Sequence, residues 1–74
     1  MSSLAEAVRE ELMANNTDYQ HLREEHARYS AQLDKLAHKK FLNEQEQLDE
    51  VRLKKLKLKA KDQMEEMVRQ VTGH

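Results

Sequence analysis

Residues 19–36 read YQHLREEHARYSAQLDKL and carry the most regular pattern in the chain. Six of them, mostly apolar, are separated alternately by three and four positions, which is the spacing of a helix that packs along one narrow face. These six are Tyr19, Leu22, His26, Tyr29, Leu33 and Leu36. The charged residues between them alternate in sign, as is typical of the exposed side of a paired helix. The pattern predicts a helix over about residues 18–40 with one apolar seam.

A second long helix is predicted over about residues 44–72, with Gly73 as its terminator. At 100° per residue, most of its apolar residues fall within an arc of roughly 160°, which is broader than a single neighbouring helix requires. The residues expected at helix interfaces are Leu53, Leu56, Leu58, Met64 and Met67. We therefore expect this helix to contact two neighbours. One is the preceding helix, and the other is either the N-terminal segment or a second protomer.

The region 38–46 is expected to connect the two helices. Phe41 and Leu42 are adjacent apolar residues that cannot both continue one seam, and Asn43 is the strongest helix stopper nearby. A short connection here gives an antiparallel helical hairpin. The region contains neither Gly nor Pro, so a single bent or continuous helix of more than about 50 residues stays open as an alternative.

The first segment, residues 1–16, predicts a short helix that precedes the hairpin of residues 17–74. Ser3 suits an N-cap, with Glu6 three positions later, as in a capping box. An apolar residue then recurs every four positions, at Leu4, Val8 and Leu12. A helix of about 12 residues is marginal on its own, so this one needs a surface on which to dock.

The composition excludes several classes of protein. The 74 residues include no Cys, no Pro and a single Gly. An all-β fold, a glycine-rich nucleotide loop, a disulfide framework and a zinc finger are therefore not expected. The 13 basic and 14 acidic residues leave a net charge of −1, unlike the strong imbalance of a typical disordered chain. A chain this short buries little surface, so we expect an all-α protein that dimerises into a helical bundle.

Targeting signals are not evident in the sequence. The N-terminus has no apolar run of signal-peptide length, and no stretch approaches the ~20 apolar residues of a membrane span. A cytoplasmic protein is the expectation.

Two stretches resemble the YdcH-like family, small bacterial helical proteins of unknown function. The first, LMANNTDYQHLREEH over residues 12–26, is similar to the family's Leu-x-x-x-Asn-x-x-Phe/Tyr-x-x-Leu-x-x-x-His opening. The second, LKKLKLKAKD over residues 53–62, is similar to the family's Lys/Leu-rich run. Tyr29 and Ala60 depart from the pattern, because the family usually has Leu at both places. The resemblance implies a helical hairpin that often self-associates in the bacterial cytoplasm, and it implies no activity.

A run of six basic residues without an acidic one lies between positions 52 and 61. It consists of Arg52, Lys54, Lys55, Lys57, Lys59 and Lys61. The favoured interpretation is a solvated helix face that pairs in part with acidic residues of the preceding helix, such as Glu24 and Glu25. The alternative is a patch that binds an anionic partner, nucleic acid above all. Against nucleic acid, the run has only one Arg and no interleaved aromatic residue for base stacking.

Other chemistry has little support in the sequence. His26 suits a pH switch or a ligand, but a polar seam residue that sets helix register is the favoured interpretation. Asp18 and His21 have the spacing of half a di-metal motif and lack a counterpart, so no metal is expected. No catalytic constellation can be assembled and no cofactor is implied. The sequence therefore predicts a non-enzymatic interaction or assembly protein of unknown role. It would self-associate through its seams or bind an unidentified protein partner.

Overall fold

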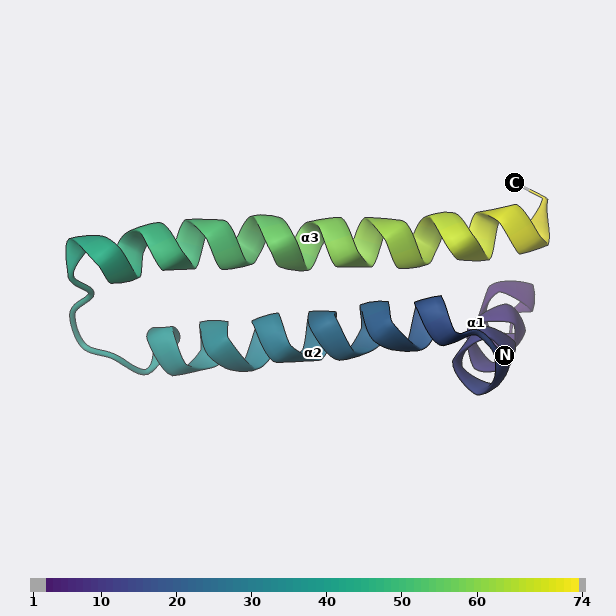
Figure 1. Cartoon of the computed structure of the whole chain (residues 1–74), viewed down its shortest axis with the longest axis horizontal. Coiled ribbons are helices and arrows are strands. Elements are labelled where there is room, and N and C mark those ends of the chain that lie inside the picture. The colour runs from purple at the N-terminus through teal and green to yellow at the C-terminus, as the bar shows by residue number, and fades with distance from the viewer. Residues whose placement is uncertain (1–2, 74) are drawn as a thin grey trace.

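Three α-helices make up the chain in the computed structural model, which describes residues 3–73. They are α1 (Leu4–Asn15), α2 (Thr17–Ala37) and α3 (Glu44–Thr72). Figure 1 shows α2 and α3 side by side in opposite directions, with α1 packed at the end where α2 begins and α3 finishes. The molecule is elongated, with extents of 44 × 22 × 20 Å. The described residues contain no strand, and the prediction of an all-helical protein is confirmed.

Polar caps define where each helix begins. The Ser3 Oγ accepts a hydrogen bond from the Glu6 backbone N–H at 3.2 Å, and the Asn16 Oδ1 accepts one from that of Tyr19 at 2.9 Å. Because Asn16 is in extended conformation directly after α1, the chain changes direction there without a loop. Gly73 ends α3 with φ +79°, a left-handed conformation that a residue with a Cβ rarely adopts.

A short turn over residues 38–43 separates α2 from α3, so the alternative of one continuous helix is wrong. α2 ends at Ala37, three residues before the predicted end, and Asn43 starts α3 rather than stopping α2. The Asn43 side chain and the Glu46 side chain each accept a hydrogen bond from the other's backbone N–H, which forms a capping box. Lys39 also forms an ion pair with Glu46 across the turn. These polar contacts stabilise the turn, a role that Gly or Pro often has in other proteins.

The seam between α2 and α3 uses all six predicted residues of α2. Tyr19 is buried, and the other five are half-buried. Between Leu53 and Met67 of α3, five positions have reduced exposure, and they are separated by four and three residues in turn. They are Leu53, Lys57, Ala60, Met64 and Met67.

Leu56 and Leu58 are also predicted at a helix interface, but they do not lie on the face of α3 that meets α2. Their exposed fractions are 36% and 58%. At 100° per residue, the seam position that follows Leu53 by four residues and precedes Ala60 by three is Lys57. A lysine therefore occupies the inward position, and the leucines on either side of it turn outward.

The best-buried part of the core lies at the α1 end of the molecule. There Val8 and Leu12 of α1 pack with Tyr19 of α2 and Val68 of α3. Ala5, Met64 and Met67 border this cluster. Burying an aliphatic side chain of this size stabilises the folded state by about 1.5–3 kcal/mol, so α1 holds the ends of the other two helices together. The second neighbour that the broad apolar arc of α3 required is thus the N-terminal helix.

Candidate anion-binding groove

The basic run of α3 divides into two stripes. Residues three and four positions apart share a helix face, so the six cations separate into two groups of three. The first group is Lys54, Lys57 and Lys61, and it lines a groove between the helices. The second group is Arg52, Lys55 and Lys59, and it lines a shallow depression on the side of α3 turned away from that groove. The run is therefore two separate positive surfaces.

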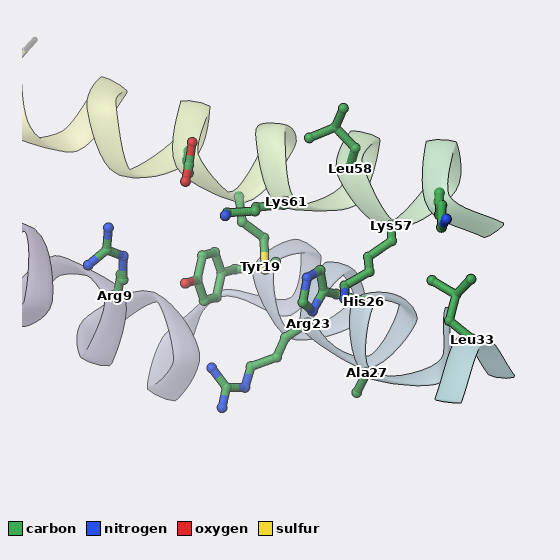
Figure 2. Close-up of a pocket in the computed structure, with 12 residues that line it drawn as sticks. Arg9, Tyr19, Arg23, His26, Ala27, Leu33, Lys57, Leu58 and Lys61 are labelled. Carbon is green, nitrogen blue, oxygen red and sulfur yellow. The ribbon is translucent and has the colours of Figure 1, made fainter. Parts of the chain in front are cut away.

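We call the first surface the cationic groove, an open cavity of about 860 Å³ to which all three helices contribute. Figure 2 shows Arg9 reaching it from α1, Arg23 from α2 and the lysines from α3. Its five cations are Arg9, Arg23, Lys54, Lys57 and Lys61. Glu65 is the only carboxylate among the described residues that line it. Low-dielectric walls around charge of one sign concentrate the field, so the groove attracts anions.

Between the positive walls, much of the groove is apolar. Its uncharged lining consists of Ala27, Leu33, Leu58 and Met64, together with Tyr19 and His26. The Tyr19 ring is only 4% exposed because it belongs to the core cluster. Tyr19 therefore offers no open ring face on which a base could stack. The groove combines an apolar surface with positive charge, and it suits a ligand that carries both features.

Lys57 is the best-shielded cation of the groove. Its side chain is half-buried at a seam position, and it extends toward the His26 ring of α2 (Figure 2). Within residues 3–73, no carboxylate oxygen lies within 4 Å of its Nζ. Lys54 differs, because its Nζ is 3.7 Å from the Glu50 Oε1 of its own helix. The groove thus holds a half-buried lysine without an acidic neighbour among the described residues.

The expectation that the run pairs with Glu24 and Glu25 is wrong for the part of the chain that the structure describes. The ion pairs found there are Lys39–Glu46, Lys54–Glu50 and Arg69–Glu66. The physical reason is the phase of α2, which brings Arg23 to the groove wall rather than either glutamate.

We call the second surface the outer patch. Its apolar residues are Leu48, Val51 and Leu56, and its cations are Arg52, Lys55 and Lys59. Leu48 and Val51 are 63% and 51% exposed. Large apolar side chains gathered beside like charges on one helix are a frequent sign of an interaction surface. Neither α1 nor α2 covers them in the folded chain.

Two groove residues were not predicted from the sequence. Arg23 directly follows the seam residue Leu22, so its place beside the seam could have been found from the 100° spacing. Arg9 carries no such signal, because its place depends on how α1 docks. His26 does lie on the seam as predicted, half-buried and beside the groove.

Residues 3–73 contain neither a metal-ion cluster nor a membrane-spanning helix. No group of three or more His, Asp or Glu side chains lies close enough to hold a metal ion. None of the described helices combines the length and apolar character that crossing a bilayer requires. Comparisons with protein-family models, with curated proteins and with solved structures find no match.

Proposed function

We propose that the protein is a small non-enzymatic interaction protein that self-associates through the outer patch. The observation that supports this proposal is the exposure of Leu48 and Val51, at 63% and 51%, beside three cations of the same helix. Removing such side chains from water favours association by about 25 cal/mol per Å² of apolar area. The YdcH-like resemblance and a cytoplasmic location remain predictions consistent with this role.

The outer patch suits self-association better than the predicted seams do. The seam residues of α2 and α3 already face each other within one chain, and pairing them between chains would require these helices to separate. The outer patch needs no such rearrangement, because it is exposed in the folded chain.

Charge complementarity supports an antiparallel arrangement of two α3 helices. A two-fold axis near Lys59 would place Asp62 and Glu66 of one copy opposite Lys55 and Arg52 of the other. Asp62 and Glu66 line the depression adjacent to the outer patch, which also contains Lys55 and Lys59. Asp62, and Glu66 with its own ion-pair partner Arg69, would therefore face cations of the other copy, and salt would weaken the pairing.

Sedimentation over a range of protein concentrations tests this proposal. We expect a concentration-dependent dimer for the unmodified chain and a monomer for the double variant Leu48→Ser/Val51→Ser. The matched control is Leu4→Ser/Val71→Ser, which removes two comparably exposed apolar side chains elsewhere and should leave the dimer intact. A chain that sediments as a monomer throughout, or an outer-patch variant that dimerises as well as the control, would contradict the proposal.

The alternative proposal is nucleic-acid binding through residues 52–61. The observation in its favour is the cationic groove, where Lys54, Lys57 and Lys61 share a face with two arginines. Binding of this kind would rest on phosphate contacts and fall steeply with salt. It would show little base preference, because the Tyr19 ring is buried.

A further inference from the structure

We propose that the cationic groove binds an acidic amphipathic helix of a partner protein, about three turns long. This inference concerns a different surface from the outer patch, so it does not depend on self-association. It rests on the length of the groove, its charge, its apolar lining and the position of Lys57.

The shape of the groove suits a helix. Its lining on α3 runs from Lys54 to Glu65, and its lining on α2 runs from Tyr19 to Leu33. At 1.5 Å per residue, the α3 side spans about 16 Å, which is the length of three helical turns. Two adjacent helices leave a channel along their line of contact, and a third helix seated there packs at an axial distance of about 8–10 Å.

The charge of the groove indicates the sign of the bound helix. Five lining cations and one lining carboxylate give a formal charge of 5 − 1 = +4. The cations come from both long helices, with Arg23 on α2 and the lysines on α3, and the lysines stand between Leu58 and α2 (Figure 2). A helix with apolar residues at i, i+3, i+4 and i+7 and carboxylates on both flanks matches that arrangement. Its apolar residues would cover Leu33 and Leu58, and its carboxylates would approach the cations.

Lys57 supports the same conclusion. It occupies a seam position that an apolar residue would fill with better packing, and it has no carboxylate within 4 Å among the described residues. A lysine held at a seam position has less freedom to reach another partner than a fully exposed lysine does, so a carboxylate that enters the groove meets it already in place. The groove therefore holds a charge that a carboxylate from a bound helix would neutralise.

Nucleic acid and a second copy of this chain suit the groove less well. A phosphate backbone gains nothing from the apolar lining, and the groove's own tyrosine ring is 4% exposed. The acidic amphipathic helix of this chain is α1, but Val8 and Leu12 of α1 are buried in its own core. Using α1 as the ligand of another copy would therefore require that core to open.

Fluorescence anisotropy with a synthetic peptide tests the proposal. The probe is a labelled 14-residue peptide that repeats Leu-Glu-Ala-Leu-Glu-Glu-Ala twice, so that leucines form one stripe. A peptide of scrambled order and a single-stranded DNA of 14 thymidines serve as comparisons. We expect the striped peptide to bind most tightly, with an affinity that falls as salt is added.

Two variants with equal charge change locate the binding surface. Lys54→Gln/Lys57→Gln/Lys61→Gln empties the groove of its lysines, and we expect it to weaken peptide binding about tenfold. Arg52→Gln/Lys55→Gln/Lys59→Gln removes three cations from the opposite side and should change it little. Arg23→Gln on α2 provides a second groove variant that leaves α3 unaltered. Circular dichroism checks that every variant folds, and sedimentation recorded alongside keeps self-association distinguishable from peptide binding.

Three results would overturn the proposal. The first is the absence of binding to the striped peptide, and the second is an equal loss of affinity in the two triple variants. The third is binding of the scrambled peptide or the DNA as tightly as the striped peptide. Tight DNA binding lost only in the groove variant would instead support the nucleic-acid alternative.

Discussion

Lys57 of α3 extends toward His26 of α2 across the middle of the seam, and both side chains are half-buried (Figure 2). Apolar residues occupy the seam on both sides of this polar pair, with Leu33 in one direction and Met64 in the other. The seam therefore places a lysine and a histidine side by side between apolar positions, beside the groove. A lysine at this position packs less well than an apolar residue would.

Replacing Lys57 with Leu should stabilise the protein. The new side chain would bury apolar area on the seam, so we expect the free energy of unfolding to rise by about 1 kcal/mol. In a chain this small, that corresponds to a rise in Tm of about 4–8 °C. Thermal unfolding followed by circular dichroism measures it. Lys55→Leu on the outer patch is the control and should give no comparable gain; equal shifts would place Lys57 outside the seam.

Leu33 and Leu58 should respond differently to the same substitution. Leu33 is half-buried on the seam, so Leu33→Asp places a carboxylate against apolar neighbours, and we expect it to lower the free energy of unfolding by about 2–3 kcal/mol. Leu58 is 58% exposed, so Leu58→Asp should change it by only about 0.5 kcal/mol. Urea unfolding at neutral pH compares the two variants. If Leu58→Asp proved the more destabilising variant, the face of α3 that carries Leu58 would be the one that packs against α2.

Acid should weaken the turn between α2 and α3. The ion pair with Lys39, and then the Asn43 backbone N–H, lower the pKa of Glu46 from its ordinary value of 4.5. A lowered pKa means that the contribution of Glu46 to stability is fully present above about pH 4.5 and is lost as the pH falls through the lower, folded-state value.

Glu46→Gln isolates this effect, because Gln also completes a capping box. We expect the variant to melt below the unmodified chain at neutral pH, and the difference in Tm to shrink as the pH falls below 4.5 and through the lowered, folded-state pKa of Glu46. Glu44→Gln removes the same charge from the same helical turn without breaking the ion pair. A Tm difference for Glu46→Gln that persists unchanged in acid would show that the ion pair is not its cause.

Helices α2 and α3 could be predicted because their ends and their apolar faces are determined by residues close together in the sequence. The 3-4 spacing from Tyr19 to Leu36 defines one face of α2 without reference to the rest of the chain. Asn43 begins α3 with its side-chain cap, and Gly73 ends it with a left-handed backbone conformation. The capping box of Asn43 and Glu46 was readable as well, but Asn43 was assigned the opposite role.

The phase of α3 could not be predicted, because its apolar residues form two overlapping sets. Leu53, Leu56 and Leu58 have the same side chain, and only Leu53 has reduced exposure. Their different surroundings depend on which face of α3 turns inward, and that face carries Ala60 and Val68, which are 3% and 5% exposed. Ala60 is too small to mark a buried face in the sequence, and Lys57 is charged although it occupies an inward position. The rotation of α3 about its own axis also determines which three lysines line the groove. The groove therefore could not be predicted from the sequence either.

The docking of α1 gives a final prediction. Leu12 is buried in the cluster with Val8 and Val68, so Leu12→Ala removes part of the contact that holds α1 in place. We expect it to lower the free energy of unfolding by about 2–3 kcal/mol. Met13, the next residue, is 40% exposed, and Met13→Ala should have little effect.

A helix of about 12 residues is marginal without tertiary contacts, so the loss of stability in Leu12→Ala should fall first on α1. Amide hydrogen exchange measures this directly: protection should drop over Leu4–Asn15 in Leu12→Ala and persist in the centre of α3. Uniform loss of protection along the chain would show instead that α1 and the other two helices unfold as one unit.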